Sequence, residues 1–245
     1  MTYCVAVRAE AGLVFLSDSR TNAGVDQINT FRKMHRYEVP GERVMVLLTA
    51  GNLSISQSVA SGLRVAMQQS SEKSLANAPN LFSAAKLVGD AVRKVHERDA
   101  AALKEFGIDF NVNLIFGGQI KGESPRLFNI YSAGNFIEAT AETPYFQIGE
   151  SKYGKPILDR VIGTQLSLDE VAKCCLISMD STMKSNLSVG LPLDLLCYEG
   201  DSLCVRRHTL IDNKDAYFSS VRESWGEQLR KVFNELPAPS YWDAL

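Results

Sequence analysis

Threonine is the second residue of the chain, where one residue can supply both a nucleophile and a base. A threonine hydroxyl is a poor nucleophile at neutral pH and needs a neighbouring base to take its proton. The α-amino group of a terminal threonine can be that base, because it titrates near pH ~8, far closer to neutrality than a lysine. Met1 is commonly removed before so small a side chain, so we expect Thr2 to become terminal without a propeptide.

Asp18 and Lys33 are the charged residues that we expect beside Thr2. The loop after the second predicted strand and the end of the next strand can both return beneath the start of the first. A lysine held against Asp18 remains cationic and lowers the proton affinity of the adjacent amine and hydroxyl. Position and charge therefore both favour a catalytic role for this pair.

Gly51 is the residue that we expect to stabilise an oxyanion. Thr49-Ala50-Gly51 ends an apolar run shortly before a predicted helix cap at Ser54. Glycine permits close approach, so its N–H is expected to point into the site beside the helix N-terminus. A pre-oriented N–H is what a tetrahedral oxyanion requires, and losing one such donor in other enzymes costs ~3 kcal/mol.

The strands that position these residues are predicted from alternation and from turn signals. Residues 2–9 and 13–17 form a hairpin around the turn Glu10-Ala11-Gly12. Gly, Pro or Asn separates most of the other strand candidates, which favours antiparallel sheets. These candidates are 31–36, 43–50, 111–119, 126–131, 136–140, 144–149, 193–199 and 203–209.

Helical periodicity predicts four helices, two of which begin with a capping box. Ser54 with Gln57 is expected to open the first helix, and Ser167 with Glu170 the third, which continues to about residue 184. The second helix covers about 81–103 and the last about 213–235. Their expected apolar faces are, in order, Ile55, Val59, Leu63 and Met67; Val88, Val92 and Val95; Val171, Cys175 and Met179; and Val221, Trp225, Leu229 and Val232.

Helices segregated from antiparallel strands indicate an α+β layered fold, with two sheets sandwiched between helices. The chain contains neither an internal repeat nor a linker rich in Pro, Gly or Ser. We therefore expect one domain over residues 1–245, with a core of about 2–210 and a C-terminal helix and tail over about 211–245.

Composition excludes several classes of function. A formal net charge of −2 with interspersed signs creates no field that would attract nucleic acid or a membrane, so we expect neither partner. The five cysteines lie in apolar runs and are expected to be reduced core thiols rather than metal or redox ligands. We expect no cofactor and no metal, and a cytoplasmic protein, because neither a signal peptide nor a membrane span is recognisable.

Other nucleophile and metal motifs are missing from the sequence. Neither H-E-x-x-H, nor a Walker loop, nor G-x-S-x-G occurs, which argues against metalloproteases, nucleotidases and serine hydrolases. The histidines His35, His96 and His208 are scattered without an acid or nucleophile at motif spacing. Cys4 shares the strand face of Thr2 but is more often a core residue than a catalytic one.

Taken together, Thr2, Ser17-Asp18-Ser19-Arg20, Lys33 and Thr49-Ala50-Gly51 resemble the catalytic segments of proteasome β-subunits, which are N-terminal-nucleophile hydrolases. The similarity extends over roughly residues 2–210, through Gly117-Gly118, Ile148-Gly149 and the segment 185–190. With its C-terminal helix and Lys152-Tyr153-Gly154-Lys155-Pro156, the chain looks most like Anbu, the ancestral β-subunit group of bacterial proteasome-type proteases.

This resemblance implies a four-layer αββα sandwich, self-assembly into rings or open helical stacks, and hydrolysis of amide bonds in peptides or proteins through an acyl-threonine intermediate. It implies that Thr2 is the nucleophile, that Asp18 and Lys33 are its charge pair, and that Gly51 is the oxyanion donor. Arg20, Thr21 and Asn22 would line the bound substrate. Any ATPase partner would be a separate chain.

Two segments depart from the family pattern. Where the family has Asp-x-x-Ser, this chain has Ser185-Asn186-Leu187-Ser188, so Ser188 matches and Ser185 replaces the aspartate. Asp180, five residues earlier, is a possible substitute. Where the family has Gly-Ser-Gly, this chain has Gly149-Glu150-Ser151, which leaves either Glu150 or Ser151 as the supporting residue.

These departures keep two other functions open beside the threonine peptidase. The same machinery serves many N-terminal-nucleophile hydrolases, so one alternative is an amidase that acts on a small or conjugated amide. The other is a catalytically silent scaffold that keeps the fold for assembly.

Overall fold

An N-terminal hairpin forms the centre of the first of two large sheets. In the computed structural model, which describes residues 1–22, 28–69 and 71–241, β1 (Tyr3–Ala9) pairs antiparallel with β2 (Gly12–Asp18). Gly12 has a φ of +142°, and a Cβ there would lie 2.0 Å from the Tyr198 carbonyl oxygen, so the turn requires glycine. The register sets Cys4 opposite Ser17 and so brings Asp18 back to the start of β1.

Three more strands complete this first sheet in the order β10-β1-β2-β11-β12. They are β10 (Tyr145–Gly149), β11 (Leu193–Glu199) and β12 (Arg207–Ile211). The second sheet has the order β5-β6-β7-β8-β9, from β5 (Met34–Val39), β6 (Arg43–Gly51), β7 (Val112–Ile120), β8 (Arg126–Ile130) and β9 (Phe136–Glu138). A two-stranded ribbon of β3 (Arg20–Asn22) and β4 (Ile28–Thr30) links the two sheets.

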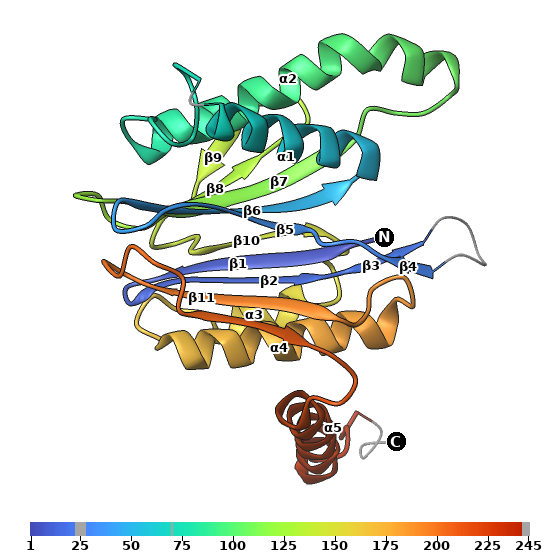
Figure 1. The fold of residues 1–245 in the computed structure, drawn as a ribbon. Coiled ribbons are helices and arrows are strands. Elements are labelled where there is room, and N and C mark those ends of the chain that lie inside the picture. The colour runs from blue at the N-terminus through green and yellow to red at the C-terminus, as the bar shows by residue number, and fades with distance from the viewer. Residues whose placement is uncertain (23–27, 70, 242–245) are drawn as a thin grey trace.

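Helices cover the outer face of each sheet (Figure 1). α1 (Leu53–Gln68) and α2 (Leu81–Glu105) pack on the second sheet, and α3 (Lys155–Val161) and α4 (Leu168–Ser185) pack on the first. Buried apolar clusters fill the three spaces between these layers; they contain, in turn, Val88 and Phe116, Phe15 and Leu48, and Val5 and Met179. The predicted α+β fold, a four-layer αββα sandwich, is confirmed.

The predicted strand 31–36 is wrong in position. Residues 31–33 lie outside the strands, and β5 begins only at Met34. The Phe31 N–H donates to the Ser19 carbonyl oxygen at 2.9 Å, and the Thr49 N–H donates to the Lys33 carbonyl oxygen at 3.0 Å. This segment crosses from the ribbon to the second sheet, and its bonds to Ser19 and Thr49 were not visible in local alternation.

Three other predicted boundaries need correction. Asn52, rather than Ser54, caps α1, because its side chain accepts the Ser54 N–H at 3.0 Å. The strand expected at 203–209 lies at 207–211, since Leu203 has a φ of 46° and belongs to a turn. The last helix begins at Ala216, after the cap Asp215, and not at about 213. The short helix α3 was not predicted. The capping box of Ser167 and Glu170 is confirmed.

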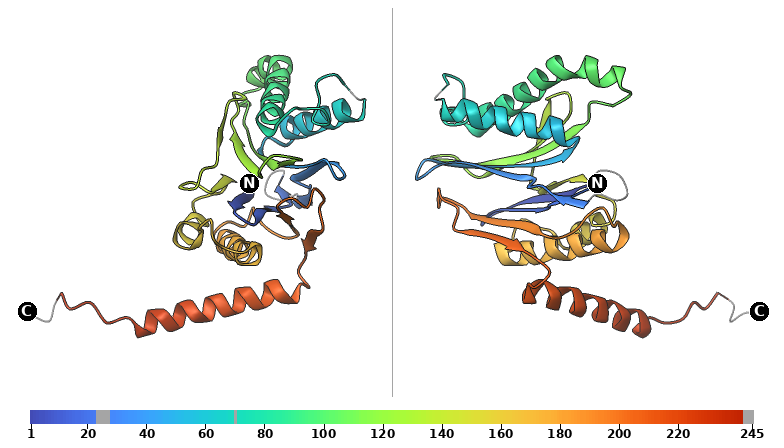
Figure 2. Two further views of the ribbon diagram at one scale, coloured as in Figure 1. Left: turned by 90° about the vertical axis from the view of Figure 1, so that its left-hand side faces the viewer. Right: turned by 45° about the vertical axis from the view of Figure 1, so that its right-hand side comes forward.

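α5 (Ala216–Glu235) projects away from the layers toward the C-terminus (Figure 2). Phe218 is buried, and Arg222 pairs with the buried Asp180 of α4, so the first turns are anchored. Beyond residue 226 the described part of the chain is exposed. The apolar stripe predicted for this helix is therefore half-buried at Val221 and Trp225 and exposed at Leu229 and Val232.

Candidate active site

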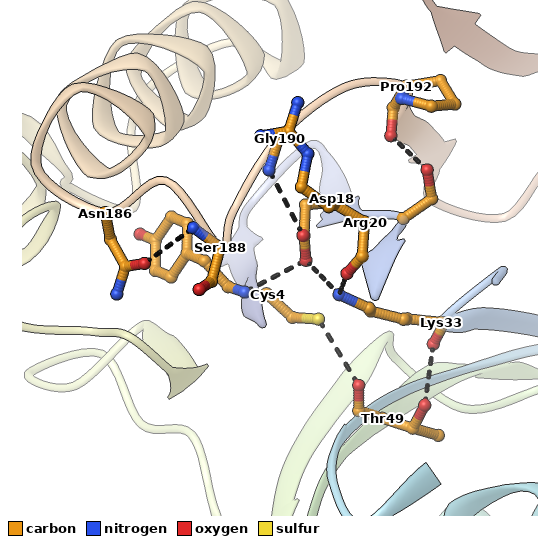
Figure 3. Close-up of polar contacts among 11 residues, drawn as sticks. Cys4, Asp18, Arg20, Lys33, Thr49, Asn186, Ser188, Gly190 and Pro192 are labelled. Carbon is orange, nitrogen blue, oxygen red and sulfur yellow. Dashed lines mark hydrogen bonds and ion pairs between the residues drawn. The ribbon is translucent and has the colours of Figure 1, made fainter. Parts of the chain in front are cut away.

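Asp18 lies at the end of β2 with no exposed surface and forms the centre of a polar cluster (Figure 3). One carboxylate oxygen, Oδ1, accepts the Tyr3 N–H at 3.1 Å and the Lys33 ammonium at 2.7 Å. The other, Oδ2, accepts the Gly190 N–H at 3.4 Å. The carboxylate therefore ties the backbone immediately after Thr2 to two segments that are distant in sequence.

Lys33 lies directly before β5, and its side chain is buried against Asp18. The Lys33 ammonium also donates to the Arg20 carbonyl oxygen at 2.7 Å. Burial raises the pKa of Asp18, whereas the Lys33 charge and the N–H donors of Tyr3 and Gly190 act in the opposite direction. The sequence prediction of an acid and a lysine paired beside the first strand agrees with this geometry.

A pocket of about 510 Å³ brings Thr2, Lys33 and Gly51 together. The Thr2 carbonyl oxygen accepts the Glu150 N–H at 2.8 Å, where β1 meets the end of β10. Gly149 has a φ of +81°, and a Cβ there would lie only 1.9 Å from the Thr2 carbonyl oxygen. The chain can approach Thr2 this closely only because residue 149 is glycine.

Gly51 ends β6 next to Asn52, the N-cap of α1. Its φ is +103°, and an added Cβ would lie 2.4 Å from the Asn111 carbonyl oxygen. A helix N-terminus carries a partial positive charge and favours anions. The glycine therefore lies at a wall of the pocket where negative charge can be stabilised.

Arg20, Thr21 and Asn22 lie on β3, and the first two have different surroundings. The Arg20 guanidinium donates to the Leu187 carbonyl oxygen at 2.8 Å and packs against Gly190, so it holds the loop after α4. Thr21 lines the pocket. For Asn22 only the backbone is described.

The residues predicted from the two departing segments are not gathered in one place. Ser185 is exposed at the end of α4, and the Ser188 N–H donates to the Asn186 side chain at 2.9 Å in the following loop. Asp180 is engaged by Arg222 at 2.7 Å. Of the two residues after Gly149, Glu150 lines the pocket, whereas Ser151 accepts a bond from Gln147 through its carbonyl oxygen.

Several residues of the site were not among those predicted from the sequence. The Tyr3 hydroxyl contacts Ser178 and Gln147, both at 2.6 Å, and so fixes the start of β1 against α4. The sequence offered one signal for Tyr3: it lies two residues before Val5 and therefore on the same face of the strand. The lining of the pocket also contains Thr49, Ser56, Asn111 and Asn113, which meet there through the pairing of β6 with β7 and the start of α1.

The remaining candidate groups serve the core. Cys4 is fully buried, burial raises the pKa of its thiol, and the thiol contacts the Thr49 carbonyl oxygen at 3.7 Å. His208 pairs with the buried Asp194.

Within residues 1–22, 28–69 and 71–241, no cluster of His, Cys, Asp and Glu could hold a metal ion. No helix in the same ranges is long and apolar enough to cross a membrane.

The chain thus combines a buried acid–lysine pair at the start of β1 with an αββα sandwich. A sequence profile described as Proteasome subunit matches residues 2–191. No match was found among curated proteins.

Solved structures identify a subgroup of this family to which the chain is similar. Anbu (ancestral beta-subunit) from Yersinia bercovieri is 52% identical, over 97% of this chain and 98% of that chain, with a TM-score of 0.92. Anbu from Hyphomicrobium sp. strain MC1 is 51% identical over 97% and 99%, with a TM-score of 0.89. The helical assembly of the Anbu complex from Pseudomonas aeruginosa is 48% identical over 97% and 98%, with a TM-score of 0.93. The chain belongs to the proteasome subunit family and, within it, to the Anbu group.

Proposed function

We propose that the protein is a threonine-type N-terminal-nucleophile peptidase that becomes competent when Met1 is removed. The observation that carries the proposal is the buried Asp18–Lys33 pair, in which Asp18 also accepts the N–H of the residue after Thr2. This arrangement places the Lys33 side chain in the same pocket as Thr2. Family membership supports a hydrolase of this kind.

In the proposed reaction, the free amine of Thr2 takes the proton of its own hydroxyl while Oγ attacks the carbonyl carbon of the scissile amide. The Gly51 N–H donates to the oxyanion, and the partial charge at the start of α1 adds to this stabilisation. The C–N bond then breaks, and the ammonium returns its proton to the leaving nitrogen. Water hydrolyses the resulting ester with the amine again acting as base, which regenerates Thr2.

Asp18 and Lys33 act through charge and position in this scheme. The Lys33 cation lowers the proton affinity of the nearby amine and hydroxyl, which eases removal of the hydroxyl proton. Asp18 keeps the ammonium in place at 2.7 Å and holds the Tyr3 backbone. Arg20 is a positioning residue, because its carbonyl oxygen holds Lys33 while its guanidinium holds the loop that presents Gly190.

Covalent labelling tests the nucleophile directly. The purified protein is expected to lack Met1 by intact mass and to form one adduct with a peptide vinyl sulfone, which peptide mapping locates on Thr2. Thr2→Ala is expected to remain unmodified under the same conditions, and Thr209→Ala, which alters an exposed threonine of β12, should label like the wild type. Retention of Met1, or equal labelling of Thr2→Ala, would contradict the proposal.

A second candidate is an amidase that acts on a small or conjugated amide. One observation favours it. Arg222 bonds Asp180, and Ser185 is exposed. In the described part of the chain, neither the Asp180 carboxylate nor the Ser185 hydroxyl therefore contacts Asp18 or Lys33. Hydrolysis of an unfolded protein such as reduced casein by the wild type, lost in Thr2→Ala, would reject this candidate.

We also propose that α5 takes part in self-assembly. Its outer half exposes Leu229, Val232 and Phe233, which recur at helical spacing and form one apolar stripe, and the exposed C-cap residue Leu236 follows directly. Monomeric proteins rarely expose contiguous apolar stripes of this kind, which usually mark an interface. The Pseudomonas aeruginosa relative forms a helical assembly.

Disrupting this stripe is expected to reduce the size of the assembly without unfolding the subunit. Leu229→Asp with Phe233→Asp places two charges on the stripe, and burying unpaired charges in an interface is costly. Light scattering after size exclusion should show smaller particles, and circular dichroism should show unchanged secondary structure. Gln228→Asp, an exposed polar position on the same helix, is the matched control. Unchanged particle size in the double variant would remove α5 from the interface.

A further inference from the structure

Tyr3 anchors the start of β1 in the layer of buried side chains between the first sheet and α4. It belongs to the same cluster as Val5 and Met179 and has no exposed surface. Thr2, one residue earlier, lines the pocket instead. Successive side chains of a strand point to opposite faces, so an anchor on Tyr3 also sets the direction in which Thr2 points.

The Tyr3 hydroxyl joins β1 to two other elements. The Gln147 side-chain N–H of β10 donates to the Tyr3 oxygen at 2.6 Å. An amide nitrogen does not accept, which leaves the phenol proton available for the Ser178 hydroxyl oxygen of α4, 2.6 Å away. A Cβ at Gly154 would lie only 2.7 Å from the Tyr3 hydroxyl, so the loop after β10 closes over this junction as glycine.

The same loop also holds Thr2. Besides contacting Tyr3, the Gln147 side chain donates to the Ser151 carbonyl oxygen at 3.3 Å. The residue before Ser151 supplies the Glu150 N–H, which donates to the Thr2 carbonyl oxygen at 2.8 Å. The Tyr3 hydroxyl therefore supports both the residue that follows Thr2 and the loop that bonds Thr2.

We propose that Tyr3 is a positioning residue: its buried hydroxyl holds the peptide unit between residues 2 and 3 so that the Thr2 side chain points into the pocket at a fixed angle. The proposal rests on the proposed function in that it takes Thr2 to be the attacking group. Burial raises the pKa of the Tyr3 hydroxyl, which stays protonated throughout the range in which an N-terminal amine titrates. Loss of the hydroxyl should therefore lower the rate of acylation equally at every pH in that range.

Tyr3→Phe removes this hydroxyl, and Tyr198→Phe is its matched control. Tyr198 is 1% exposed, its hydroxyl donates to the Gln119 side chain at 2.6 Å, and it pairs with Leu13, at the far end of β2 from Asp18. We expect Tyr3→Phe to react with the peptide vinyl sulfone about tenfold or more slowly than Tyr198→Phe, because small displacements of a reacting group are costly in rate. The loss should fall on the maximal rate rather than on the half-saturating concentration, with the pH inflection of the wild type.

Hydrogen exchange tests the position of Thr2 without any reaction. The Glu150 amide is bonded to the Thr2 carbonyl oxygen, so a displaced Thr2 exposes it to solvent. Mass spectrometry of peptic fragments should show faster exchange at Glu150 in Tyr3→Phe than in Tyr198→Phe. Ser178→Ala removes the same bond from the side of α4. It should reproduce both effects, add little when combined with Tyr3→Phe, and replace that variant should it not fold.

The outcomes separate this proposal from the proposed function. Labelling of Tyr3→Phe as fast as that of Tyr198→Phe, a shifted pH inflection, or equal exchange at Glu150 in the two variants overturns the positioning role. If the wild type is not labelled on Thr2 at all, the peptidase proposal fails, and exchange at Glu150 alone decides whether Tyr3 positions Thr2.

Discussion

Replacing Lys33 by methionine is expected to lower the free energy of unfolding by about 3–5 kcal/mol near neutral pH, because it leaves a buried carboxylate without its cation. Asp18 has no exposed surface, and Lys33 is the ammonium in contact with it at 2.7 Å. The N–H groups of Tyr3 and Gly190 remain as partners but carry no formal charge. Urea unfolding of wild type and variant measures the difference.

This deficit should depend on pH in a defined direction. Burial raises the pKa of Asp18 and Lys33 opposes that rise, so the pKa of Asp18 in Lys33→Met lies still higher than in the wild type. A carboxyl whose pKa is raised on folding binds more protons in the folded state, so its contribution to stability falls as pH rises through that pKa. The deficit is therefore largest near neutral pH and shrinks as the pH is lowered.

Two further variants isolate the cause. Combining Lys33→Met with Asp18→Asn removes both charges and should recover much of the lost stability and abolish its pH dependence. Lys155→Met breaks the exposed pair with Asp159 and should cost at most about 1 kcal/mol. If Lys33→Met proves no more costly than Lys155→Met, the buried pair is not the electrostatic centre of the site.

Gly149→Ala is expected to slow acylation of Thr2 by about 100-fold, because displacement of a reacting group by about 1 Å can cost that much. The added methyl group would lie 1.9 Å from the Thr2 carbonyl oxygen, and the residue has a φ of +81°. The strand must shift to relieve this clash, and Thr2 shifts with it. The rate of vinyl sulfone adduct formation, followed by intact mass, reports the effect.

The control for this variant is Gly163→Ala, because a Cβ at Gly163 would meet nothing within 4 Å. Its labelling rate should equal that of the wild type. Circular dichroism separates misplacement from unfolding, since Gly149→Ala is expected to retain its secondary structure. A Gly149→Ala protein that labels as fast as Gly163→Ala would show that the contact between β10 and Thr2 does not position the nucleophile.

Much of the fold was predictable because hydrophobic periodicity is a local property. The alternation of β1 and β2 and the helical faces with Val88 and Val171 were read correctly from residues close together in sequence. The errors fell where a distant segment decides the conformation. The Phe31 N–H donates to the Ser19 carbonyl oxygen at 2.9 Å, and the Leu203 carbonyl oxygen accepts the Gly41 N–H at 3.1 Å.

The candidate site divides in the same way. Thr2, Asp18, Lys33 and Gly51 were predicted by residue type and spacing, and the structure brings them to one place. The position of Asp180 relative to the site was not predictable, because its carboxylate pairs with Arg222 of α5, 42 residues away. The position of Glu150 at the pocket likewise depends on how β10 ends.

By itself the sequence determined the chemical groups of this protein and the periodic segments that carry them, because side-chain chemistry and local alternation need no knowledge of distant residues. Only the tertiary structure decided that Gly190 supports Asp18 across 172 residues, and that hydroxyls and amides from β3, β6, α1 and β7 form one pocket wall. Such contacts follow from the packing of layers, in which many weak interactions along the whole chain act together.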